Sequence, residues 1–104
     1  YDFYFDRGVA GFGSMLNDFQ VDAAGEYIYI ADPSVVGGAP GLVVHSVRER
    51  RSWRVLSGHP SMRGASHTFS IAHLRDFPGL GSVGFNVGVD LIALSRDGET
   101  LFYG

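Results

Sequence analysis

The chain has 104 residues, 45% of them hydrophobic and 13% aromatic, which suits a small folded domain and excludes a disordered tail. A formal net charge of −3 gives no basic face of the kind that binds nucleic acid. The absence of cysteine excludes disulfides and thiolate metal sites, and the apolar runs are far shorter than the roughly 20 residues that span a bilayer.

Fifteen glycines, with prominent Tyr, Phe, Val and Ile, favour short strands joined by tight turns. The alternation at residues 1–5 predicts the end of a strand, and residues 6–14 predict a glycine-rich loop. Four strands are expected next, at residues 16–22, 27–32, 41–47 and 51–56. Four consecutive antiparallel strands form one blade of a β-propeller.

Residues 58–88, rich in Gly, Pro, Ser and His, predict an irregular connection with at most a short helix at 71–76. A strand is expected at 89–95, followed by an Asp-Gly turn and a returning strand at 100–103. We therefore expect an all-β chain, a partial β-propeller of about one four-stranded blade plus parts of its neighbours. Within this single propeller domain, residues 1–104, the expected parts are the end of a preceding blade (1–5), one blade (15–57), a long connection (58–88) and the start of the next blade (89–104).

The first strand pair recurs near the end of the chain. Gly98 aligns with Gly25, 73 residues earlier, and Asp90 aligns with Asp18 if one residue is inserted in the turn. This period exceeds the roughly 40 to 50 residues of a compact blade, and residues 58–88 accommodate the difference. Because two copies cannot close a ring, we expect the remaining blades to belong to the same chain.

Several short stretches follow one another in a characteristic order along most of the chain. They are Leu-Asn-Asp at 16–18, Val-Asp at 21–22, Tyr-Ile-Ala-Asp at 29–32, Gly-Leu-Val-Val at 41–44, Ser-Trp-Arg-Val at 52–55, His-Pro-Ser at 59–61, Gly-Val-Asp at 88–90 and Ile-Ala-Leu-Ser at 92–95. In these stretches the chain resembles the major royal jelly protein and yellow family of six-bladed propellers. One departure is Leu91, which follows Asp90 where the family pattern has glycine. The resemblance implies an extracellular or periplasmic protein that binds a small molecule, an aromatic amine among the implied ligands, in its central funnel.

Three polar residues are the candidate ligand-binding site: Asn17, Asp18 and Asp90. The first strand of each propeller blade lines the central channel, so residues at its mouth converge on the axis. Carboxylate and amide oxygens accept hydrogen bonds from a cationic amine, and they also suit a divalent cation such as Ca²⁺, with Asn17 and Asp90 as its candidate ligands. The alternative is that the aspartates bind strand and turn amides and hold the blade geometry.

Three functions remain open. The first is a small-molecule-binding propeller of the major royal jelly protein and yellow type. The second is a metal-dependent lactone hydrolase, because the Asn-Asp start of the inner strand is similar to the metal-binding positions of gluconolactonase-like propellers. The third is a protein-interaction propeller, for which residues 33–40 form the most exposed-looking loop. Whether the chain is an enzyme stays open, since it contains no complete catalytic constellation.

Other motifs have simple structural explanations. Residues 79–84 match Gly-x-Gly-x-x-Gly but neither follow a strand nor open a helix, as a dinucleotide site requires. The arginines between residues 48 and 54, Arg54 among them, suit a hairpin turn with solvated side chains better than a nucleic-acid surface. The four histidines match no compact zinc spacing.

Overall fold

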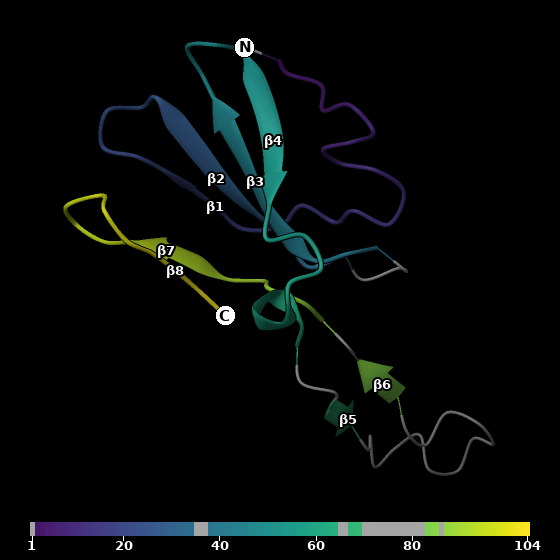
Figure 1. Cartoon of the computed structure of the whole chain (residues 1–104). Helices are drawn as coiled ribbons and strands as arrows, with labels where there is room; N and C mark the ends of the chain where they lie inside the picture. The colour runs from purple at the N-terminus through teal and green to yellow at the C-terminus, as the bar shows by residue number, and fades with distance from the viewer. Residues whose placement is uncertain (1, 35–37, 65–66, 70–82, 86) are drawn as a thin grey trace.

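The computed structural model describes residues 2–34, 38–64, 67–69, 83–85 and 87–104 (Figure 1). Its main sheet is antiparallel, with neighbouring strands in chain order: β1 (Phe19–Val21), β2 (Tyr27–Asp32), β3 (Gly41–Ser46) and β4 (Arg51–Val55). A 3-10 turn, η1 (Pro60–Met62), follows it. Two hairpins complete the described elements: β5 (His67–Phe69) with β6 (Val83–Phe85), and β7 (Ile92–Leu94) with β8 (Leu101–Tyr103). The chain is all-β, a partial propeller with one four-stranded blade and part of a neighbour.

Six strands expected from the sequence are confirmed in their order, and each is equal to or shorter than its predicted range. The described residues 2–5 pair with no strand in the described part of the chain, and their assignment to the end of a preceding blade stays a prediction. Their alternation serves side-chain packing, since the rings of Phe3 and Phe5 lie 4.4 and 6.4 Å from the imidazole of His45.

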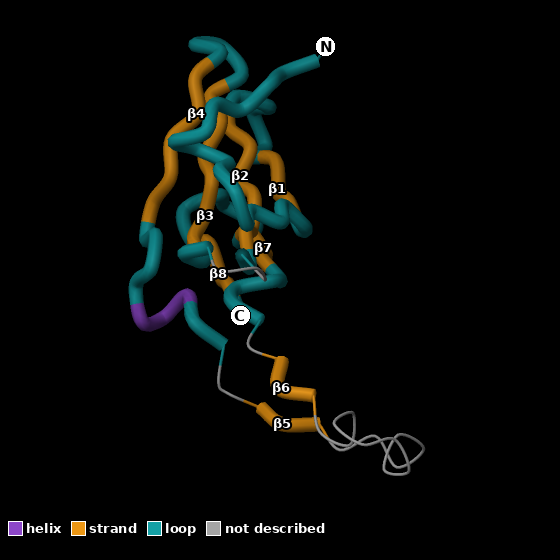
Figure 2. The backbone as a smooth tube through the Cα atoms, turned by 90° about the vertical axis from the view of Figure 1, so that its right-hand side faces the viewer, coloured by secondary structure: helices purple, strands orange, loops and turns teal. Residues whose placement is uncertain are grey.

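The connection at residues 58–88 is more regular than its composition predicts. It contains η1 and the antiparallel pair β5–β6. Figures 1 and 2 show β5 and β6 well apart from the main sheet. The helix expected at 71–76 and most of the glycine motif at 79–84 lie outside the described residues. In the described part of the chain, no helix has the length and apolarity needed to cross a membrane.

The hydrophobic core lies between the main sheet and the β7–β8 hairpin. Its buried members come from β2, β3, η1, β7 and the segment before β7: Ala31, Leu42, Met62, Val89 and Ile92. Gly88 brings this segment against the blade, because a Cβ at Gly88 would lie 2.3 Å from the Cβ of Pro40. The buried apolar surface therefore lies between the two blades and holds them together, and it does not form a core within one blade.

A buried ion pair fixes the end of β2. Asp32 is fully buried, and its Oδ2 accepts a hydrogen bond from Nη1 of Arg54 at 2.6 Å. Its Oδ1 accepts from the backbone amide of Met15 at 2.8 Å and from the amide and hydroxyl of Ser34 at 3.0 and 3.1 Å. A buried charge is tolerated when it is paired and its lone pairs are hydrogen-bonded, and Asp32 meets both conditions.

The Arg54 side chain is only 14% exposed, so the expected solvated arginine at this position is wrong. Its guanidinium also donates to the carbonyl oxygens of Val9 at 2.8 Å and Ala39 at 2.7 Å. Together with Asp32, it ties the N-terminal loop and the β2–β3 loop to β4. Sequence position alone does not reveal this, because the two charged partners are 22 residues apart.

The pKa of Asp32 reflects the same contacts. Burial by itself raises this pKa, but hydrogen bonds from the Ser14 side chain, Arg54 and the Met15 amide, with the charge of Arg54, lower it below its ordinary value of 3.8. The folded state therefore binds fewer protons at this carboxyl in acid than the unfolded state does. The resulting stabilisation is complete above the unfolded pKa and is lost as the pH falls through the folded one.

We expect Asp32→Ala to lower the free energy of unfolding by about 3 to 5 kcal/mol, because Arg54 is left buried without its partner. Urea unfolding of the full-length protein at neutral pH measures this loss. Arg48→Ala, at an exposed turn position, is the matched control and should change the free energy by less than about 0.5 kcal/mol. Equal losses in the two variants would contradict a special role for the pair.

Candidate functional site

The hairpins β1–β2 and β7–β8 repeat in one register. Phe19 pairs with Ile30 in the first hairpin, and Ile92 pairs with Tyr103 in the second, each 73 residues later. Residues 95–100, between β7 and β8, correspond position by position to residues 22–27 at the same offset, although Tyr27 already belongs to β2. The insertion expected in the second turn is therefore wrong, and the two copies superpose residue for residue.

A β-bulge precedes β1. The amide of Asn17 donates to the carbonyl oxygen of Ala31 at 3.0 Å, while the amide of Ala31 donates to the carbonyl oxygen of Asp18 at 2.8 Å. Two residues of one strand thus oppose one residue of the other. Bulges of this kind redirect side chains and are frequent next to functional sites.

The same bulge precedes β7. The amides of Asp90 and Leu91 donate to the carbonyl oxygen of Gly104 at 2.9 and 3.1 Å, and the amide of Gly104 donates back to Leu91 at 3.0 Å. Asp90 is therefore the equivalent of Asn17, and Leu91 is the equivalent of Asp18. The sequence alignment of Asp90 with Asp18 is wrong by one residue, because it matched residue types rather than bulge positions.

The two equivalent side chains meet. Nδ2 of Asn17 donates to Oδ1 of Asp90 at 2.5 Å. Asn17 is exposed and Asp90 partly so, and β1 and β7 are in contact. The structure thus brings together two of the three predicted site residues, each two residues before the first strand of its hairpin.

Asp18 lies beside this pair but has a different partner. Its Oδ2 accepts a hydrogen bond from the backbone amide of Ile92 at 2.9 Å, across the contact between β1 and β7. This is the amide-binding arrangement that the sequence left open for the aspartates. Asp18 therefore fixes the relative position of the hairpins that carry Asn17 and Asp90.

The fold and this repeated geometry agree with the comparison with known families. The model of the major royal jelly protein family matches residues 2–104. The chain belongs to the major royal jelly protein family. The resemblance seen in the short ordered motifs is thereby confirmed. No curated protein matches the chain.

In this family member, Asn17 and Asp90 do not by themselves form a cation cage. Ca²⁺ takes six to eight oxygen ligands, whereas this pair is joined by an amide N–H that points at the carboxylate. The described residues hold no group of three or more His, Asp or Glu side chains arranged for a metal ion. The lactone-hydrolase alternative would therefore need oxygen ligands from beyond this set.

Two further findings concern burial. In the loop at 33–40, Pro33 and Ser34 are buried, so the expectation of an exposed loop is wrong at its start. His45 is 3% exposed, and its Nδ1 lies 2.8 Å from Oγ of Ser52. Burial, with the charge of Arg50, lowers the pKa of His45, which suits a packed neutral imidazole.

Sequence reasoning missed the pairing of Asp32 with Arg54, which anchors the segment leading to Asn17. A weak signal was available. An aspartate closes the apolar strand Tyr27–Asp32 directly before Pro33, and charged residues in such a position need a partner when they are buried.

We expect Asp18→Ala to raise the hydrogen-exchange rate of the Ile92 amide about tenfold, because this amide loses its hydrogen bond to a charged acceptor. Hydrogen–deuterium exchange of the full-length protein measures this rate. The Tyr27 amide, which binds Asp22 within the first hairpin, should keep its rate and serves as the internal control. An unchanged Ile92 rate would refute the positioning role of Asp18.

Proposed function

We propose that this chain contributes to a small-molecule site at the mouth of the propeller's central channel. Asn17 and Asp90 are the polar contacts, and Asp18 is a positioning residue that holds their hairpins together. One observation carries the proposal. Nδ2 of Asn17 and Oδ1 of Asp90, equivalent bulge residues of two hairpins, lie 2.5 Å apart in a partly exposed position beside β1 and β7. The position at the channel follows from the expectation that the first strand of each blade faces the propeller axis.

The charge of this pair selects a cationic ligand. One carboxylate oxygen of Asp90 receives the Asn17 amide, and the other has no hydrogen-bond partner among the described residues. The amide oxygen of Asn17 is a second hydrogen-bond acceptor in the same side-chain pair. A protonated amine carries up to three N–H donors, so it can donate one charge-assisted hydrogen bond to each of the two acceptors.

An aromatic amine fits this proposal, in agreement with the ligand class that the family resemblance implies. The ammonium group would lie at Asp90, and the ring would extend into the channel. The lactone-hydrolase and protein-interaction alternatives have no comparable observation in their favour.

Calorimetry of the full-length protein with tyramine tests the proposal. Asp90→Asn should weaken tyramine binding about tenfold, because the charge is removed while the shape is kept. Asn17→Ala should weaken it less, since a neutral acceptor is lost. The uncharged analogue 4-ethylphenol should bind more weakly than tyramine.

Asp97→Asn is the matched control, because Asp97 is an exposed aspartate in the β7–β8 turn, at the far end of the same hairpin. It should leave the affinity for tyramine unchanged. The proposal fails if tyramine binds Asp90→Asn and Asn17→Ala as tightly as the unmodified protein.

A further inference from the structure

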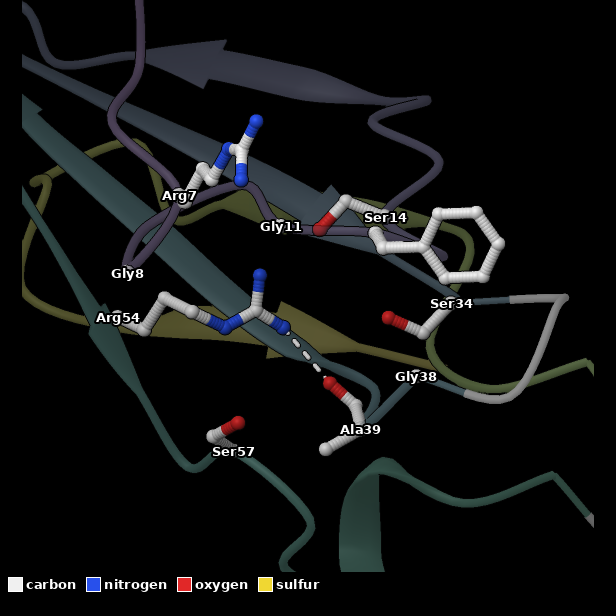
Figure 3. Close-up of a pocket in the computed structure, with 10 residues that line it drawn as sticks. Arg7, Gly8, Gly11, Ser14, Ser34, Gly38, Ala39, Arg54 and Ser57 are labelled. Atoms are coloured by element: carbon white, nitrogen blue, oxygen red, sulfur yellow. Dashed lines mark hydrogen bonds between the residues drawn. The ribbon is translucent and has the colours of Figure 1, made fainter.

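A second hollow lies beside the Asp32–Arg54 ion pair, between the N-terminal loop, the β2–β3 loop and the end of β4 (Figure 3). Its volume is about 210 Å³. Polar side chains from these three segments line it: Arg7, Ser14, Ser34, Arg54 and Ser57. Their convergence makes the hollow a candidate site for a small polar group.

Arg54, which lines the hollow, has more N–H donors than its described contacts use. A guanidinium has five N–H groups, and the described contacts of Arg54 use three, to Asp32, Val9 and Ala39. Figure 3 shows the hydrogen bond between Arg54 and Ala39, both of which line the hollow. Because the ion pair is held from several sides, these remaining donors are fixed in place before any ligand arrives.

Arg7 supplies the charge. It is exposed, lines the hollow, and has no ion pair or hydrogen bond of its side chain within the described residues. Among the residues that line the hollow, Arg7 and Arg54 are the charged ones, and Arg54 is paired with Asp32, so Arg7 contributes the unpaired positive charge of this lining. The Asp6 carboxylate accepts hydrogen bonds from the amides of Gly8 and Val9 and keeps its negative charge, but it is not among the residues that line the hollow.

Ser57 adds a neutral donor at the opposite wall. Its hydroxyl has no hydrogen-bond partner among the described residues, whereas the Ser34 hydroxyl donates to Asp32. Guanidinium and hydroxyl donors that converge on a positively charged hollow are suited to the oxygens of an anion. The volume is below the roughly 300 Å³ at which pockets for drug-sized ligands begin, so the hollow suits a single anionic group.

We propose that this hollow binds a small oxyanion, the phosphate or carboxylate group of a ligand, with Arg7 as its principal contact and Ser57 and Arg54 as supporting donors. The site is separate from the proposed amine site and has the opposite charge preference. Asp32 contributes to the position of both sites. It binds Arg54 beside the hollow, and it directly follows Ala31, the residue opposite the bulge at Asn17.

Titration of the full-length protein with inorganic phosphate, and in a parallel arm with acetate, tests the proposal by calorimetry at constant ionic strength. The stronger ligand of the two identifies the group that the hollow prefers. Arg7→Gln should weaken the binding of that ligand about tenfold, and Ser57→Ala should weaken it less. Arg96→Gln, at an exposed turn of the β7–β8 hairpin, is the matched control and should have no effect.

Binding of neither anion by the unmodified protein overturns the proposal, as does equal weakening by Arg7→Gln and Arg96→Gln. If Arg7→Gln lowers the urea midpoint of unfolding, the anion affinity of Arg7→Lys is measured as well, because this variant keeps the positive charge and loses the planar guanidinium group. Unmodified affinity in both Arg7 variants overturns the proposal. Tyramine binding separates the two sites, because Arg7→Gln should leave it intact and Asp90→Asn should leave anion binding intact.

Discussion

The carboxylate of Asp32 is the contact on which the arrangement of this blade depends. It binds Arg54 of β4, the amide of Met15 before β1, and Ser34 at the start of the β2–β3 loop. Removal of one partner would leave a charge buried without compensation, which is far more costly than loss of a surface ion pair. Because Met15 precedes Asn17 by two residues, this contact also determines where the chain enters the bulge.

The second constraint is the contact between the two hairpins. Apolar side chains from both, Ala31 and Ile92 among them, share one core, and the Asp18 carboxylate binds the Ile92 amide beside it. Hydrophobic contact is not directional, whereas a hydrogen bond to a strand amide fixes register. The two together explain how Asn17 and Asp90 reach hydrogen-bond distance, although each belongs to a different hairpin.

The sequence was sufficient to predict the strands, because alternation and turn residues are local signals. It was also sufficient to indicate the family, since the ordered motifs extend over most of the chain. It could not reveal the bulges, because these are defined by backbone hydrogen bonds to Ala31 and Gly104 rather than by residue type. The alignment of Asp90 with Asp18 failed for this reason.

The local sequence also could not predict which charged side chains are buried. Arg54 lies among arginines that are exposed, and nothing in that run distinguishes it. Its partner Asp32 is distant in sequence, so only the folded sheet brings them together. The packing of Phe3 and Phe5 on His45 is similar, since an alternating pattern indicates one buried side but not what covers it.

The bulge has a consequence for how such a protein can change over evolution. Two of its backbone hydrogen bonds occur at equivalent positions in both hairpins, yet one copy carries a neutral amide at Asn17 and the other an acid at Asp90. The side chain at this position takes no part in the strand ladder. Each repeat can therefore acquire its own charge at the bulge while the scaffold stays constant, so the charge of this position and the stability of the fold can be selected separately.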